Sequence, residues 1–118
     1  MAQMAQAAAA ALTGPDTHPD TLARVAQTIA DTPEQTWRAI LPCLTTFNRR
    51  DDQHRITQPS LLIAGGHDQN APARTMEKMA AKLPDARYAC IETAGHMIQM
   101  EAPDATNTLI ADFLKETA

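Results

Sequence analysis

The stretch that decides the fold runs from Gln58 to His96 and reads QPSLLIAGGHDQNAPARTMEKMAAKLPDARYACIETAGH. Residues 60–64 form a short apolar run that follows a proline and ends at two glycines. Such a run is typical of a strand that is buried on both faces of a parallel sheet. Because Gly65 and Gly66 allow a sharp turn, Asp68 should follow on the loop just past the carboxyl end of this strand.

A helix is predicted next, because apolar residues recur there with helical spacing, at Met76, Met79, Ala80 and Leu83. Pro72 suits its first turn and Pro84 ends it. A second strand at 87–92 then completes a right-handed βαβ unit with parallel strands. His96 lies just past this strand, so Asp68 and His96 should meet at one edge of the sheet, where the sites of open α/β sheets form.

A wider set of residues accompanies these two turns. It consists of Ile56, Pro59, Leu61-Leu62-Ile63, Gly65-Gly66, Asp68, Pro72, Pro84, Ala86-Arg87, Gly95-His96, Glu101, Pro103 and Phe113-Leu114. Over residues 51–114 this pattern closely resembles the C-terminal part of α/β-hydrolase-fold enzymes. Within that family it resembles the small esterase-, lactonase- and haloperoxidase-like members. The first fifty residues match only loosely. The resemblance implies that Asp68 and His96 are the acid and the histidine of a Ser-His-Asp triad that hydrolyses a small ester or lactone.

The nucleophile of that family is missing from the pattern. The family carries it on a Gly-x-Ser-x-Gly elbow, and this sequence has no such motif. Ser60 is the only serine, and it lies at the entry of the first strand, at the opposite end of the sheet from Asp68 and His96. In a complete enzyme the elbow and the oxyanion donors would precede Met1. We therefore expect the isolated chain to be inactive.

The first half of the chain predicts three helices. Residues 1–12 are rich in alanine and are followed by Gly14 and Pro15, which end a helix. A second helix should begin at Pro19, and a third at Pro33. The third carries its apolar side chains on one face, at Trp37, Ile40, Leu41, Leu44 and Phe47, and it should kink or split at Pro42. These helices either correspond to the end of the family's cap or simply cover a sheet.

The expected fold class is α/β: a partial α/β-hydrolase fold with two parallel strands, a crossover helix and a C-terminal helix. Residues 1–50 would form a helical, cap-like segment and residues 51–118 a βαβα segment, together one compact unit. Within it, 48–55 is predicted to be a solvated charged linker. The helix that starts at Pro103 should bury one stripe, formed by Ala105, Leu109, Ile110, Phe113 and Leu114.

Composition excludes several functions. The net charge of −4 gives no support for nucleic-acid binding, and no apolar run is long enough to span a bilayer. We expect no cofactor and no metal, because the histidines lack regular spacing. His54 and His67 are predicted to be exposed polar residues, and His18 is predicted to lie in a turn. Cys43 and Cys90 are expected to be buried, reduced thiols, which fits a cytoplasmic setting.

Two parallel strands leave a sheet edge unpaired, and we expect another copy of the chain, another polypeptide or its own N-terminal helices to cover it. Three hypotheses follow. The chain could be a hydrolase part, either one piece of a split enzyme that needs a complementary N-terminal hydrolase chain, or a truncated remnant that keeps only the acid and the histidine of the triad. It could be a non-catalytic module that self-associates as a homodimer through the open sheet edge. A thiol or redox role for Cys90 is the third hypothesis, and the position of this residue inside a strand weighs against it.

Overall fold

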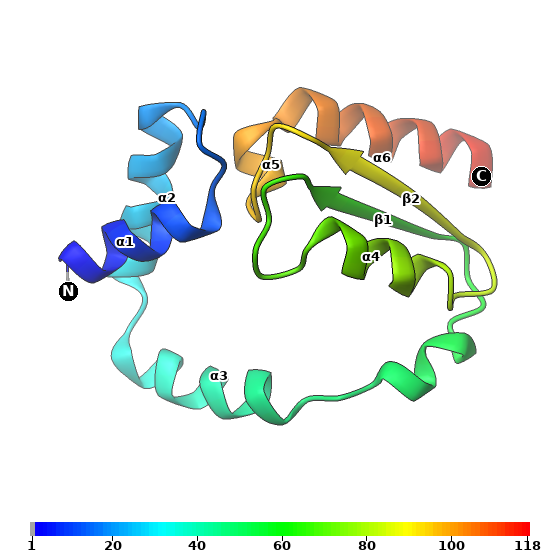
Figure 1. The fold of residues 1–118 in the computed structure, drawn as a ribbon, viewed down its shortest axis with the longest axis horizontal. Coiled ribbons are helices and arrows are strands. Elements are labelled where there is room, and N and C mark those ends of the chain that lie inside the picture. The colour runs from blue at the N-terminus through cyan, green and yellow to red at the C-terminus, as the bar shows by residue number, and fades with distance from the viewer. Residues whose placement is uncertain (1) are drawn as a thin grey trace.

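A computed structural model describes residues 2–118 and places two parallel strands at the centre of an α/β fold (Figure 1). Strand β1 spans Ser60–Gly65 and β2 spans Ala86–Ile91. They pair in register from Ser60 opposite Ala86 to Gly65 opposite Ile91. Both predicted strands are confirmed to within one residue at each end. The matched register means that the two chains leave the sheet at the same level.

Helices lie on opposite sides of the two strands (Figure 1). The crossover helix α4, Ala73–Ala80, packs against β1 and β2, and so does the C-terminal helix α6, Pro103–Thr117. The short helix α5, Ile98–Glu101, joins β2 to α6. The predicted βαβ unit and the C-terminal helix are therefore confirmed, although α4 ends sooner than the stripe to Leu83 indicated.

Helix α6 buries less of its apolar stripe than the sequence predicted. Leu109 and Phe113 are half-buried, whereas Ala105, Ile110 and Leu114 are exposed. A sheet of two strands is too narrow to cover the whole stripe. A residue of β2 also binds this helix. Arg87 forms an ion pair with Glu116, and its guanidinium lies 5.7 Å from the centre of the Phe113 ring, as in a cation–π contact.

The N-terminal helices lie beside the sheet rather than over it. Helices α1, Ala2–Leu12, and α2, Pro19–Asp31, pack against each other near the carboxyl ends of the strands (Figure 1). Small side chains make this contact close, and its fully buried residues are Ala5, Ala9 and Val25. Both helices were predicted, although Met1 lies outside the described residues. Of the alternatives left open for the N-terminal helices, covering a sheet does not describe α1 and α2, which pack against each other beside the strands (Figure 1).

Helix α3, Glu34–Thr46, is a continuous helix that arcs away from the strands and leads into the 3-10 helix η1, Arg50–Arg55 (Figure 1). The predicted split at Pro42 is absent. The carbonyl that loses its backbone donor there lies on an exposed helix, where water can solvate it. Cys43 is exposed on the same helix, which corrects the prediction that it is buried.

The apolar face of α3 has little to pack against. Leu44 is 67% exposed and Phe47 is 73% exposed. The whole chain has an accessible surface of 8365 Å², whereas a compact monomer of 12.8 kDa has about 6,300 Å². Its radius of gyration is 15.8 Å, against about 13.5 Å for a compact domain of this length.

None of the helices in the described residues combines the length and the apolar character that a membrane-spanning helix needs.

Glycines allow the two turns at the carboxyl end of the sheet to touch. A Cβ on Gly65 would lie 1.9 Å from the Gly95 carbonyl oxygen, and one on Gly95 would lie 2.6 Å from the Thr13 carbonyl carbon. No glycine in the described residues has a positive φ. These glycines therefore provide space between three backbone segments rather than the special turn conformation that the sequence suggested.

We expect Gly65→Ala to lower the free energy of unfolding by about 1–3 kcal/mol, since a methyl group there must displace backbone rather than a flexible side chain. The measurement is urea unfolding followed by circular dichroism. Ala105→Ser, which adds one atom at an exposed position of α6, is the control and should change stability by less than about 0.5 kcal/mol. Equal stability of Gly65→Ala and the wild type would contradict the close approach.

Candidate active site

Asp68 and His96 form a hydrogen-bonded pair at the carboxyl end of the sheet. The His96 Nδ1 atom lies 2.8 Å from Asp68 Oδ2, although the residues are 28 positions apart in the chain. The Asp68 side chain is 6% exposed and the imidazole of His96 is 42% exposed. The structure thus brings together the two residues that the sequence singled out. One is buried and the other reaches the surface.

The second carboxylate oxygen of Asp68 has a structural role. Oδ1 accepts hydrogen bonds from the backbone N–H groups of Asn70, at 2.8 Å, and Ala71, at 3.0 Å. This is the local turn that aspartate often makes after glycines. The two oxygens therefore act separately, since Oδ1 shapes the loop and Oδ2 meets the imidazole.

The environment of Asp68 favours its charged form. Burial raises the pKa of the carboxyl, but hydrogen bonds from Ala71, His96 and Asn70 oppose it, and the pKa lies below its usual value. A carboxylate at this position accepts a proton-bearing Nδ1, which fixes the imidazole in the tautomer whose Nε2 is a free base. The pair can therefore take up a proton at Nε2.

Backbone hydrogen bonds join the two loops that carry the pair. The Gly66 N–H donates to the Ile91 carbonyl at 2.9 Å, and the His67 N–H donates to the Ala94 carbonyl at 2.9 Å. The strands end in register, so these bonds continue the ladder past the sheet. The relative placement of Asp68 and His96 is thus fixed by the backbone as well as by their side chains.

Other residues approach His96 that the sequence did not mark as part of a site. The His96 N–H donates to the Leu12 carbonyl at the end of α1, at 2.8 Å. Glu101 accepts from the N–H groups on both sides of His96, those of Gly95 and Met97. Glu101 had entered the sequence pattern only as part of the family resemblance. Nothing in the sequence indicated that the loop after α1 would contact this turn.

The remaining polar candidates lie elsewhere. Ser60 is at the amino end of β1, where its hydroxyl donates to the Gln58 carbonyl. His54 and His67 are exposed, as predicted, and His18 is exposed at the N-terminal cap of α2. Cys90 is partly buried in β2, and burial raises the pKa of its thiol, which disfavours a reactive thiolate. Within residues 2–118, no three His, Cys, Asp or Glu side chains gather as metal ligands would.

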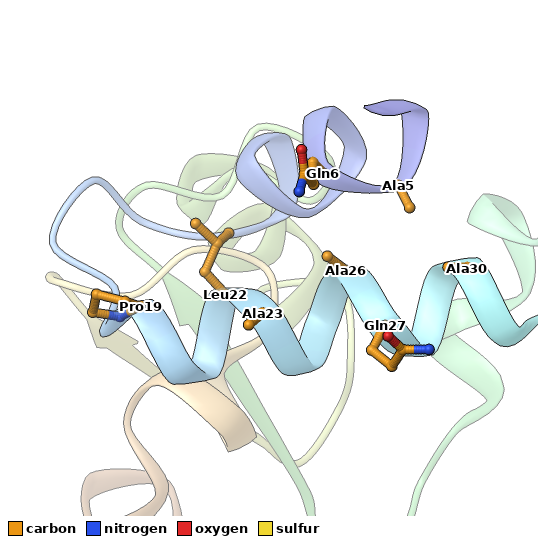
Figure 2. A pocket seen from close by; sticks show the side chains of 8 residues that line it. All are labelled: Ala5, Gln6, Pro19, Leu22, Ala23, Ala26, Gln27 and Ala30. Carbon is orange, nitrogen blue, oxygen red and sulfur yellow. The ribbon is translucent and has the colours of Figure 1, made fainter. Parts of the chain in front are cut away.

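Three hollows of the surface of the described residues have linings that do not include Asp68 or His96. Figure 2 shows one of about 540 Å³ between α1 and α2. Its lining is Ala5, Gln6, Pro19, Leu22, Ala23, Ala26, Gln27 and Ala30, which includes no titratable side chain. Small alanine side chains leave this space open at the edge of the helix contact. It offers no group that could act on a substrate.

The alpha/beta hydrolase fold family model matches residues 2–103, which extends the likeness into the N-terminal helices. Among curated proteins, the mouse protein ABHD8 is 39% identical over 59 residues, which are 50% of this chain and 13% of that protein. BpoC of Mycobacterium tuberculosis, named as a non-heme bromoperoxidase, is 34% identical over 76 residues, 64% of this chain and 29% of that protein.

Solved structures give the same result. A thermophilic esterase from Thermogutta terrifontis superposes with a TM-score of 0.88 at 25% identity, over 98% of this chain and 44% of the esterase. An enol-lactonase from Burkholderia xenovorans superposes with a TM-score of 0.77 at 26% identity, over 82% of this chain and 37% of the lactonase. The chain spans less than half the length of these structures.

The lowered pKa of Asp68 has a consequence for acid stability. Its folded-state pKa lies below the unfolded value of 3.8, so its contribution is complete above that value and is lost as the pH falls through the folded-state pKa. We expect Asp68→Asn to show a smaller fall in the free energy of unfolding between neutral and strongly acidic pH than the wild type. Urea unfolding across that range measures it.

The matched control is Asp85→Asn, which removes one carboxylate from an exposed turn. It should keep the acid sensitivity of the wild type. If both variants lose stability in acid as the wild type does, Asp68 carries no favourable interaction in its charged form.

Proposed function

We propose that this chain, which belongs to the α/β-hydrolase fold family, supplies the acid and the histidine for hydrolysis of a small carboxylic ester or lactone. Asp68 is the acid and His96 is the general base. The observation that carries the proposal is the 2.8 Å contact between His96 Nδ1 and a buried Asp68 oxygen. The likeness to an esterase and an enol-lactonase supports this choice of substrate class.

In the proposed mechanism, Nδ1–H of His96 donates to Asp68, and Nε2 takes the proton of a serine hydroxyl as its oxygen attacks the carbonyl carbon. The imidazolium then gives that proton to the departing alcohol oxygen, which leaves an acyl-enzyme. Water, deprotonated by the same Nε2, then attacks the acyl carbon, and the imidazolium returns its proton to the serine oxygen as the bond from that oxygen to the acyl group breaks and the acid leaves. Asp68 stabilises the imidazolium in both steps.

The serine must come from another polypeptide segment. Ser60 is the only serine in the sequence, and it lies at the wrong end of β1. Donors for the oxyanion would have to accompany the missing elbow, and the loss of even one such donor lowers kcat by about 10²–10³-fold. We therefore propose that the isolated chain does not catalyse hydrolysis at a useful rate. The free thiols Cys43 and Cys90 fit a reducing, cytoplasmic setting for it.

Complementation tests this function. We expect hydrolysis of p-nitrophenyl acetate when the chain is mixed with the portion of the Thermogutta terrifontis esterase that it does not overlay, expressed as a separate polypeptide. In the mixture, His96→Ala should lower kcat by about 10³-fold or more, because the serine loses its base. Asp68→Asn should act in the same direction through the tautomer of His96.

His67→Ala is the matched control, since His67 is the exposed neighbour of Asp68 and contributes only its backbone to the site. Its kcat should stay within about twofold of the wild type. A mixture that associates but hydrolyses no ester, or one in which His96→Ala keeps full activity, would refute the proposal.

A second candidate function is that of a non-catalytic module that forms a homodimer. The accessible surface exceeds that of a compact monomer by about 2,000 Å², from 8365 Å² against about 6,300 Å². A standard interface buries about 800 Å² on each partner. Large apolar side chains are exposed in this part of the chain: Ile40, Leu41 and Leu44 in α3, Phe47 directly after it, and Ile56 directly after η1. A second copy could cover this face and an open sheet edge together.

Native mass spectrometry at micromolar concentration tests the dimer. We expect a dimer for the wild type and at least about a tenfold larger dissociation constant for Leu44→Lys, which puts a charge into the apolar face. Gln35→Lys, on the opposite face of α3, adds the same charge and should leave the dissociation constant unchanged. A monomeric wild type would remove this candidate.

A further inference from the structure

Glu101 gathers more hydrogen bonds than any other side chain described near the site. Its Oε1 accepts from the Gly14 N–H at 2.6 Å and from the Thr17 hydroxyl at 2.7 Å. The Gly95 N–H lies 3.1 Å from both of its oxygens, and the Met97 N–H donates to Oε2 at 3.1 Å. The donors come from two segments, 84 to 87 positions and 4 to 6 positions away in the chain.

The charge of this carboxylate is met by backbone and hydroxyl donors. Among the described residues, no Lys, Arg or His forms an ion pair with Glu101. Hydrogen bonds to a carboxylate are shorter and roughly twice as strong as neutral ones. A half-buried carboxylate with several such donors at fixed positions is a rigid anchor for the segments that supply them.

The anchored turn is the one that carries the imidazole. Three consecutive backbone N–H groups, those of Gly95, His96 and Met97, are all engaged: the outer two by Glu101 and the middle one by the Leu12 carbonyl. This leaves the His96 backbone little freedom. A general base must be held to within about 0.5 Å of its productive position, and a supporting shell of this kind achieves that.

The same carboxylate also holds the loop between α1 and α2. Gly14 and Thr17 belong to that loop, and its backbone lies so close to the histidine turn that a Cβ on Gly95 would sit 2.7 Å from the Gly14 nitrogen. The helical segment and the turn of His96 therefore share one acceptor. If α1 and α2 move away, Glu101 loses two donors and His96 loses the Leu12 carbonyl.

We propose that Glu101 is the positioning residue of His96, and that it couples the docking of the α1–α2 loop to the placement of the imidazole opposite Asp68. Glu101 touches no reacting atom. Its role in hydrolysis rests on the function proposed above for His96, whereas the coupling between the loop and the histidine turn stands on the structure alone.

Amide hydrogen exchange of the full chain, read by NMR, tests the coupling. Glu101→Gln keeps the shape but turns one acceptor into an NH₂ group that faces donors. We expect the amides of Gly14, Gly95 and Met97 to exchange at least about tenfold faster in this variant. The NMR-measured pKa of the Asp68 carboxyl should rise towards its ordinary value, because the His96 hydrogen bond that lowers it becomes loose.

Thr17→Val is the matched variant, because it removes the hydroxyl bond from the loop and leaves the bonds to Gly95 and Met97 in place. Because the loop and the histidine turn share this acceptor, we expect faster exchange at Gly14, Gly95 and Met97 together, each by a smaller factor than in Glu101→Gln, and a smaller rise in the pKa of Asp68. Faster exchange at Gly14 alone would contradict the coupling. A purely structural role for Glu101 would speed exchange without moving that pKa, and unchanged exchange at Gly95 and Met97 in Glu101→Gln would overturn the proposal outright.

Two further readouts complete the test. If Glu101→Gln does not fold, hydrogen exchange in the wild type tests the coupling instead. The amides of Gly14, Gly95, His96 and Met97 should then exchange with one common free energy of opening. Different free energies for the loop and for the turn would refute the coupling. In the complemented ester assay, Glu101→Gln should lower kcat about tenfold or more with KM unchanged. If no mixture hydrolyses ester, the exchange experiment still decides the role of Glu101, and only the proposed function fails.

Discussion

The parallel, in-register pairing of β1 with β2 is the constraint on which the rest of the structure depends. Because Gly65 lies opposite Ile91, both chains leave the sheet at one edge and at one level. The loops that follow can then bond to each other through their backbones, as Gly66 does with Ile91. A shift of the register would separate these loops and break the contact between Asp68 and His96. The register of the strands therefore places the two loops, and the side chains of Asp68 and His96 then make their contact.

The site also shows how one carboxylate can serve the fold and the chemistry together. Aspartate after two glycines is common in turns, and Asp68 does make such a turn with Oδ1. Its other oxygen is thereby fixed in direction and meets His96. Glu101 repeats this arrangement at the histidine, where a carboxylate from a short helix holds backbone donors on both sides of the imidazole. Both carboxylates, that of Asp68 within the pair and that of Glu101 beside His96, thus accept hydrogen bonds from backbone N–H groups of the loops that carry the pair.

The packing of the chain is uneven. The buried apolar residues lie in and just after the two strands and between α1 and α2. Among the described residues there are seven, and four of them are alanines: Ala5, Ala9, Ala64 and Ala94. Along α3, Ile40, Leu41 and Leu44 remain exposed. Burial of such side chains is the main source of stability in folded proteins, so this surface has much to gain from a partner. Either proposed role, as part of a hydrolase or as a homodimer, would use it.

Sequence alone determined the local elements of this protein. The apolar run at 60–64, the helical period after Pro72 and the glycines beside Asp68 and His96 report local geometry, and local geometry is what periodicity and turn residues encode. They were sufficient to place both residues at one edge of a parallel sheet.

Only the tertiary structure decided which faces have partners. The stripes of α3 and α6 have the period of buried helices, yet Leu44 and Leu114 are exposed, because a period marks a face and does not supply what covers it. The bonds from Glu101 to Gly14 and Thr17 cross 84 to 87 positions of chain, and no local signal predicts a contact over that distance. The sequence therefore fixes where each element forms, whereas the close approach of separate backbones fixes how the histidine turn is held.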